Sequence, residues 1–215
     1  MTAVQLSARD VLRAAYNNRY TWDSSFPGYT TDVEFKHGDQ VYTGKARVNP
    51  DLSAEVFESE DEAALKLIKG QLWEVAIHRV RRDFEDTHGK NTFALGNTDD
   101  RGAIEVLVEG KSAGDKYKIF NDEVVLVHRH IHGVVVTINT FSTHDTGAGY
   151  LSHTYDSVYH DPKTGEQKKG RSEFTDEYDQ VGDYFVLTRR AIASADEGDM
   201  EFVFSGIQLL NPAAA

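Results

Sequence analysis

Apolar and polar positions alternate along this chain with two periods, one typical of helices and one typical of strands. Residues 59–82 have the helical period, which predicts one long helix. Ser59 followed by Glu62 indicates its start, and Arg79, Arg81 and Arg82 would place positive charge at its end. The apolar residues that form one stripe along this helix are Ala64, Leu65, Ile68, Leu72, Val75, Ala76 and Val80.

A shorter helix is predicted within residues 1–18. Ser7 and Asp10 have the spacing of a capping box, in which the hydroxyl accepts from a backbone amide three residues later. Leu6 and Val11 occupy the positions of a hydrophobic staple, and the Asn17–Asn18 pair marks the end. This helix therefore has start and stop signals of its own.

The remaining segments read as strands in hairpin order. Residues 28–57 predict the first strands, and residues 91–210 predict an antiparallel meander. Its clearest hairpin joins residues 116–120 to residues 123–131 through the Asn121–Asp122 turn. The other predicted strands are 28–36, 41–48, 52–57, 134–141, 150–160, 170–180, 183–191 and 200–209.

These elements define an α+β fold with a large, curved antiparallel sheet of about ten or eleven strands. We expect a half-barrel or open barrel packed on the long helix, with a short N-terminal helix. The chain contains no repeat or proline-rich linker, so residues 1–215 are expected to form one domain. Residues 211–215 are expected to be a frayed tail.

Charge and composition exclude several classes of partner. The chain has 23 basic and 35 acidic residues, a net charge of −12, which argues against nucleic acid and anionic lipid headgroups. Arg79, Arg81 and Arg82 could form an anion site, but complementation of the helix dipole is the favoured interpretation. There is no cysteine, no secretory signal pattern and no apolar run long enough to span a bilayer. The expected location from these features is the cytoplasm.

A series of histidines is the main candidate for metal chemistry. His128, His130 and His132 alternate, so they share one face if the strand continues to the turn, and paired imidazoles can ligate a metal. The hypothesis of an enzyme adds His153, which lies further along the chain. The alternative is that these histidines are solvated or paired across strands. The familiar catalytic signatures, G-x-S-x-G, H-E-x-x-H and a glycine-rich phosphate loop, do not occur, so an enzyme is the weaker expectation.

An aromatic loop follows the first helix. The stretch Arg19–Tyr29 contains Trp22, Phe26 and Tyr29, more aromatic surface than a connection needs. We expect Trp22, Phe26 and Tyr29, with Trp73 of the long helix, to contact an apolar ligand, the loop acting as its lid. In the alternative, these aromatics seal the end of the barrel as ordinary core.

Two resemblances extend this interpretation. The stretches GKARVNP, DYFVLTRR and MEFVFSGIQL, in the order of elements described above, resemble the lipoprotein-carrier superfamily, whose half-barrel takes up acyl chains. The stretches NRYTWDSSFPGY and FSGIQLLNP are similar to a cyanobacterial and plastid family known by a domain-of-unknown-function label. The second resemblance implies photosynthetic cells as the setting, and it implies no activity or catalytic residues.

The leading functional hypothesis is a non-enzymatic binding or carrier protein for a lipid, pigment or isoprenoid held in a cavity of the curved sheet. The alternatives are a metalloprotein or enzyme using the histidines and an assembly factor that binds another protein. A homodimer through exposed sheet edges is a further expectation. The sequence specifies no cofactor.

Overall fold

The computed structural model describes residues 6–59 and 61–210. The α-helices are α1 (Ala8–Asn17), α2 (Glu62–Arg79) and α3 (Phe84–His88), and Gly110–Ser112 forms a short 3₁₀ helix. The strands are β1 (Tyr29–His37), β2 (Gln40–Val48), β3 (Ala54–Phe57), β4 (Thr92–Thr98), β5 (Ile104–Glu109), β6 (Lys116–Phe120), β7 (Glu123–Ile131), β8 (Val134–Asp145), β9 (Tyr150–His160), β10 (Ser172–Val181), β11 (Tyr184–Ser194) and β12 (Met200–Leu209).

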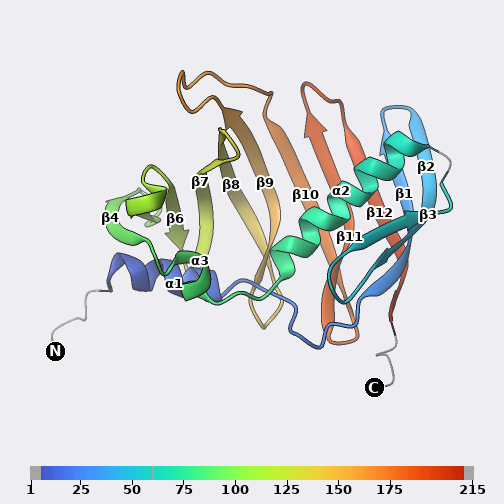
Figure 1. The fold of residues 1–215 in the computed structure, drawn as a ribbon, viewed down its shortest axis with the longest axis horizontal. Helices are drawn as coiled ribbons and strands as arrows, with labels where there is room; N and C mark the ends of the chain where they lie inside the picture. The colour runs from blue at the N-terminus through green and yellow to red at the C-terminus, as the bar shows by residue number, and fades with distance from the viewer. Residues whose placement is uncertain (1–5, 60, 211–215) are drawn as a thin grey trace. The chain divides into compact units, whose positions relative to one another are not determined.

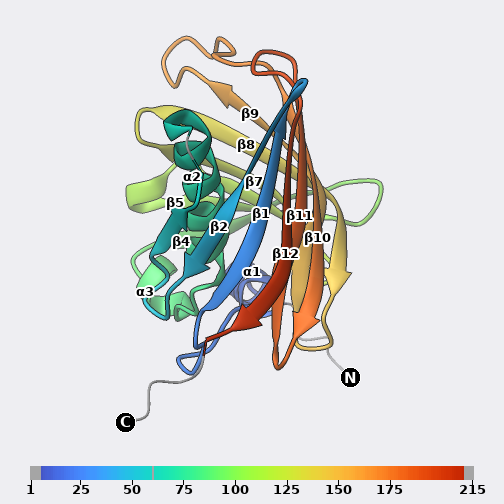
Figure 2. The same ribbon diagram turned by 90° about the vertical axis from the view of Figure 1, so that its right-hand side faces the viewer.

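The strands hydrogen-bond in the order β3-β2-β1-β12-β11-β10-β9-β8-β7-β6-β5-β4 (Figures 1 and 2). The order has two ends, so the sheet is open. The predicted α+β class with a large antiparallel sheet is confirmed, with twelve strands in the described residues rather than ten or eleven. The expected frayed tail, residues 211–215, lies outside the described part of the chain.

The chain divides into two compact units. The first comprises Met1–Tyr20 and Arg82–Glu173, and the second comprises Thr21–Arg81 and Phe174–Ala215. Each unit contains a helix packed on antiparallel strands. That all 215 residues form one domain remains a prediction.

The first unit is organised around α1. Ser7 is its N-cap and accepts a hydrogen bond from the backbone N–H of Asp10, as the capping box predicts. Leu12 and Ala15 are buried on the face of α1 that contacts β4, β5, β6 and β7. The core that they join also contains Ala8, Val11, Tyr16, Phe84, Val106, Val108, Tyr117 and Ile119.

The second unit is organised around α2, which lies on one face of its strands (Figure 1). Five of the seven residues of the predicted apolar stripe are buried, namely Ala64, Ile68, Leu72, Val75 and Ala76. Leu65 is half-buried, and Val80 lies beyond the end of the helix. On the sheet side, the rings of Phe35 and Phe202 stack with their centroids 4.4 Å apart. Figure 2 shows β2, β1, β12, β11 and β10 side by side in this unit.

The boundaries of α2 differ from the predicted 59–82. Asp61, not Ser59, is the N-cap, and its carboxylate accepts from the Ala64 N–H at 2.8 Å. At the other end, the Arg79 carbonyl accepts from the Trp22 N–H at 2.8 Å, and Val80 is extended. Because the Arg79 carbonyl accepts from Trp22 and not from a later residue of the helix, the helix ends before Arg81.

Candidate functional site

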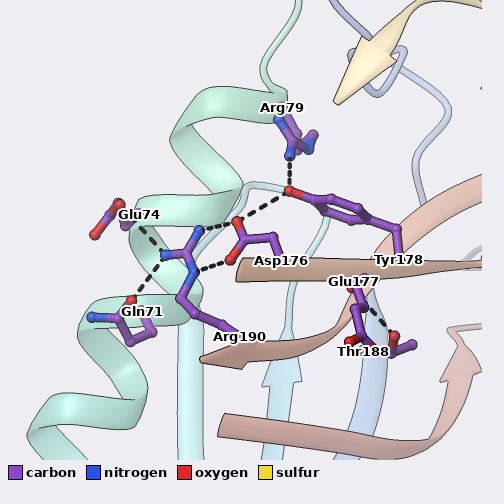
Figure 3. Close-up of polar contacts among 8 residues, drawn as sticks. All are labelled: Gln71, Glu74, Arg79, Asp176, Glu177, Tyr178, Thr188 and Arg190. Atoms are coloured by element: carbon purple, nitrogen blue, oxygen red, sulfur yellow. Dashed lines mark hydrogen bonds and ion pairs between the residues drawn. The ribbon is translucent and has the colours of Figure 1, made fainter. Parts of the chain in front are cut away.

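A buried ion pair lies between α2 and the sheet of the second unit (Figure 3). Arg190 of β11 donates two hydrogen bonds to Asp176 of β10, Nε to Oδ1 at 2.8 Å and Nη2 to Oδ2 at 2.6 Å. The two residues are 4% and 1% exposed. Two parallel hydrogen bonds of this kind pair the positive guanidinium with the negative carboxylate, and burial strengthens their attraction.

The same guanidinium connects the sheet to the helix. Nη1 of Arg190 donates to Oε1 of Gln71 at 2.9 Å and lies 3.4 Å from Oε1 of Glu74, both on α2. On the other side, the Tyr178 hydroxyl donates to Oδ2 of Asp176 at 3.2 Å and accepts from Nη2 of Arg79 at 3.1 Å (Figure 3). Burial raises the pKa of Tyr178, so this hydroxyl stays protonated. The helix is therefore held on the sheet by polar contacts as well as apolar ones.

The outward side of α2 carries a second apolar row. Trp73 is 56% exposed, Leu67 is 38% exposed and Ile77 is half-buried. At 3.6 residues per turn these three residues fall within about one third of the helix circumference, a sector that they share with Lys66 and Glu74. A helix that is apolar on opposite sides normally buries both, but the described chain covers only one side of α2. Of the four predicted ligand-binding residues, Trp73 is the accessible one.

The aromatic loop packs into the second unit. Trp22 and Phe26 stack at 3.9 Å between ring centroids, and Tyr29 meets both rings edge to face. All three are 2 to 4% exposed, and Nε1 of Trp22 donates to the Phe185 carbonyl at 3.0 Å. The structure thus brings Trp22, Phe26 and Tyr29 together as a packed cluster. Ligand binding by these three residues remains a prediction.

Gly28 sets the direction in which this loop enters β1. Its φ is +82°, a left-handed conformation that favours glycine. A Cβ here would lie 2.3 Å from the Val48 carbonyl oxygen. The close approach of the two chain segments therefore depends on glycine at this position.

Of the three candidate metal-binding histidines, His128 and His130 remain neighbours on β7, with ring centroids 6.1 Å apart. β7 ends at Ile131, so His132 lies in the following turn with a φ of +48°. His128 contacts the Thr137 hydroxyl at 2.8 Å, and His130 contacts Oδ1 of Asp115 at 3.0 Å. Among residues 6–59 and 61–210, no group of three or more His, Cys, Asp or Glu side chains is arranged to hold a metal ion. Metal binding by these histidines remains a prediction.

A shallow hollow of about 320 Å³ lies beside His128 in the first unit. Its lining residues are His128, Val135, Thr137, His160, Asp161, Pro162 and Gly165. Burial and the nearby Lys116 lower the pKa of His128, so the imidazole is neutral at physiological pH. Asp161, at the rim, already binds Lys168 at 3.1 Å.

A second hollow, of about 460 Å³, opens on the face of β10, β11 and β12 that bears Glu177 and Arg189. Arg189 binds Glu177 at 2.9 Å and Glu201 at 2.6 Å, and Asp179 also lines the hollow, so acidic groups outnumber the one arginine there. Both hollows are shallow and partly polar. Neither is lined by Trp22, Phe26, Tyr29 or Trp73.

His88 of α3 is a buried titratable group that the sequence did not reveal. Its Nδ1 has no hydrogen-bond partner in the described part of the chain, and its ring packs against Tyr16 and Phe84. Burial, with Arg129 nearby, lowers its pKa to about 4. His88 is therefore a neutral core residue at physiological pH.

The buried ion pair and the outward apolar row of α2 differ in how far the sequence could predict them. Asp176 and Tyr178 alternate on β10 and therefore share a face, but nothing in the sequence pairs them with Arg190. The spacing of Leu67, Trp73 and Ile77 indicated the outward apolar row. The stripe toward the core was by itself sufficient to predict the helix. Exposure in the structure is what distinguishes the two sides.

The comparisons with known proteins identify the family. A model for the family DUF3386, described as a protein of unknown function, matches residues 3–210, so this chain belongs to that family. No curated protein sequence matches the chain. No helix in the described residues is long and apolar enough to cross a membrane.

Two solved structures are similar to most of this chain at low sequence identity. A LolA superfamily protein from Nitrosomonas europaea is 10% identical, with 96% of this chain and 95% of that chain covered and a TM-score of 0.40. A domain from Vibrio parahaemolyticus assigned to outer membrane lipoprotein sorting is 11% identical, with 94% and 92% covered and a TM-score of 0.33. Sequence identities and TM-scores this low do not support a conclusion about function.

Proposed function

We propose that this protein is a non-enzymatic binding or carrier protein for an apolar small molecule such as a lipid, pigment or isoprenoid. The observation that carries the proposal is the outward apolar row of α2, in which Trp73 is 56% exposed and Leu67 is 38% exposed. We propose this row as the contact site. The proposed setting is the cytoplasm or stroma of a photosynthetic cell, at or near the thylakoid surface.

The physical argument starts from the cost of leaving this row in water. Covering the exposed part of the Trp73 indole contributes roughly 2–3 kcal/mol at 25 cal/mol per Å². Leu67 and Ile77 are ten residues apart, which is about 15 Å along a helix. An elongated apolar molecule therefore fits the row better than a compact one.

The two tryptophans allow a direct test by fluorescence. Trp22 is 3% exposed, so acrylamide quenching of the native protein reports mainly on Trp73. We expect oleic acid or phytol, added below its aggregation concentration, to shift the emission to shorter wavelength and to reduce quenching. Either effect would show an apolar molecule over Trp73.

A variant pair makes the test specific for α2. Leu67→Ser removes apolar surface from the row and should weaken binding about fivefold to tenfold, since 1.4 kcal/mol is tenfold. Val41→Ser alters a residue of β2 that is also exposed, and it should bind like the native protein. Unchanged Trp73 quenching with both amphiphiles, or equal binding by the two variants, would exclude this contact site.

A further inference from the structure

His88 of α3 lies in a cage of aromatic rings that four elements of the first unit supply. Its ring centroid is 5.3 Å from that of Tyr16 on α1 and 5.1 Å from that of Phe84 on α3. On the sheet, it is 6.2 Å from that of Phe93 on β4 and 6.0 Å from that of Tyr117 on β6. The residue is 6% exposed, and its Nδ1 has no hydrogen-bond partner among residues 6–59 and 61–210. One buried ring therefore contacts both helices and two strands of the sheet.

The charges that act on His88 are those of arginines. Arg129 of β7, Arg19 and Arg9 all oppose a positive charge on the imidazole. Arg19 is fixed against the cage, because its guanidinium carbon lies 3.7 Å from the centroid of the Tyr16 ring. Burial acts in the same direction, since a charged ring in the cage would lose its hydration.

Carboxylates near the cage already have cationic partners. Glu85 of α3 binds both Arg9 and Arg13 of α1. Oδ2 of Asp115 lies 3.5 Å from Nε of Arg129. The other acidic residues of α1 and α3, Asp10 and Asp86, are exposed. In the described part of the chain, a positive His88 ring would therefore gain no carboxylate of its own.

Charges on the two strands of the cage do not change this balance. β4 contains no charged residue. On β6, Lys116 and Lys118 alternate with Tyr117 and so lie on the opposite face of the sheet, where they bind Glu105 and Asp99. The neutral ring is therefore the form that fits the closed cage.

Proton uptake by His88 is coupled to opening of the cage. The pKa of His88 is about 4 in the folded chain, whereas an exposed histidine has a pKa of about 6.5. A state in which the ring is exposed therefore binds the proton first as the pH falls. The stability of the closed state is complete above about pH 6.5, and lowering the pH from 7 to 5 shifts the opening equilibrium roughly twentyfold.

The two helices of this unit are joined to each other. Besides the ion pairs of Glu85, the hydroxyls of Tyr16 and Thr87 form a hydrogen bond of 2.8 Å between α1 and α3. After the end of α1, the Tyr20 N–H donates to the Tyr150 carbonyl at 2.9 Å, which ties the chain to β9. The helices can therefore separate from the strands together, with this backbone contact as the point that stays attached.

We propose that His88 is an acid-sensitive latch, and that proton uptake by its ring between pH 7 and pH 5 favours an opened state in which α1 and α3 separate from β4 and β6. Opening uncovers apolar core residues, among them Leu12, Val106 and Ile119. The latch does not involve α2, so it is independent of the ligand proposed for that helix.

Hydrogen exchange of the full chain at pH 7 and pH 5 tests this proposal, with each amide expressed as protection relative to its intrinsic exchange rate. In the native protein, protection of α1 should fall about twentyfold between the two pH values, and protection of α2 should change much less. An equal fall in α1 and α2 would overturn the proposal, because it would show unfolding of the whole chain and not opening of a latch.

A variant pair assigns the effect to His88. His88→Phe keeps an aromatic ring in the cage that cannot take up a proton, so its α1 protection should not fall between pH 7 and pH 5. His132→Asn alters an exposed histidine in the turn after β7, and it should behave like the native protein. A fall in α1 protection that is the same in His88→Phe and in the native protein would contradict the assignment.

An NMR titration of the native protein needs no variant. The His88 ring signals should remain those of the neutral form at pH 5 in the closed state, since protonation occurs near pH 4 there. A His88 ring that titrates near pH 6.5 while α1 stays protected would overturn the latch.

Discussion

Among single residues, Arg190 has the largest expected effect on stability. Its guanidinium is buried and shared between Asp176 on the sheet and Gln71 on α2. Removing one partner of a buried pair leaves an uncompensated charge, which costs about 3–5 kcal/mol. By contrast, the neighbouring Arg189 forms ion pairs that are partly exposed, and such pairs contribute little.

We therefore expect Arg190→Met to lower the free energy of unfolding by about 3–5 kcal/mol, measured by urea denaturation. The control Arg189→Met should lower it by less than about 1 kcal/mol. The double variant Asp176→Leu/Arg190→Met removes both charges and should recover much of the loss. Equal losses of unfolding free energy in the two single variants would contradict this expectation, because they would show that breaking the Arg190–Asp176 pair leaves no uncompensated buried charge.

Residue roles were only partly predictable from sequence. The aromatic composition of residues 19–29 identified Trp22, Phe26 and Tyr29 as a group, and the structure packs them together. The histidine prediction depended on the strand reaching His132, but the Ile131–Val134 turn needs a positive φ there. Sequence spacing could not show that His130 pairs with Asp115, a residue outside the predicted hairpin.

At the scale of elements, two substitutions at the start of α2 test which residue is its N-cap. Asp61→Ala removes the acceptor for the Ala64 N–H and should cost about 1 kcal/mol of unfolding free energy. Ser59→Ala, at the position expected from sequence, should cost a few tenths of a kcal/mol at most. Thermal or urea unfolding of the two variants distinguishes them, and a larger loss in Ser59→Ala would contradict the observed cap.

Elements with strong local signals were predicted almost to the residue. The hairpin of β6 and β7 has the expected bounds, because Asn121 and Asp122 both adopt the positive φ that its two-residue turn requires. The helix α3 was missed, since five residues are too few to show a helical period. The ends of α2 depended on Trp22, a distant residue that no local pattern reveals.

At the scale of the whole molecule, the fold class followed from the alternation of strands and turns and from the lack of helices between the later strands. The net charge of −12 describes the composition but does not locate any site. Function depends on which apolar surfaces the folded chain leaves uncovered. Helix periodicity alone cannot distinguish the covered side of α2 from the uncovered one.

Native mass spectrometry of the protein purified without detergent tests the central claim, that the chain binds an apolar small molecule, most directly. The account predicts added mass in stoichiometric amount per chain, released by organic solvent as an apolar compound and depleted in a Trp73→Ala variant. A native protein that carries no added mass, even after incubation with lipids, isoprenoids and pigments from photosynthetic cells, would contradict it.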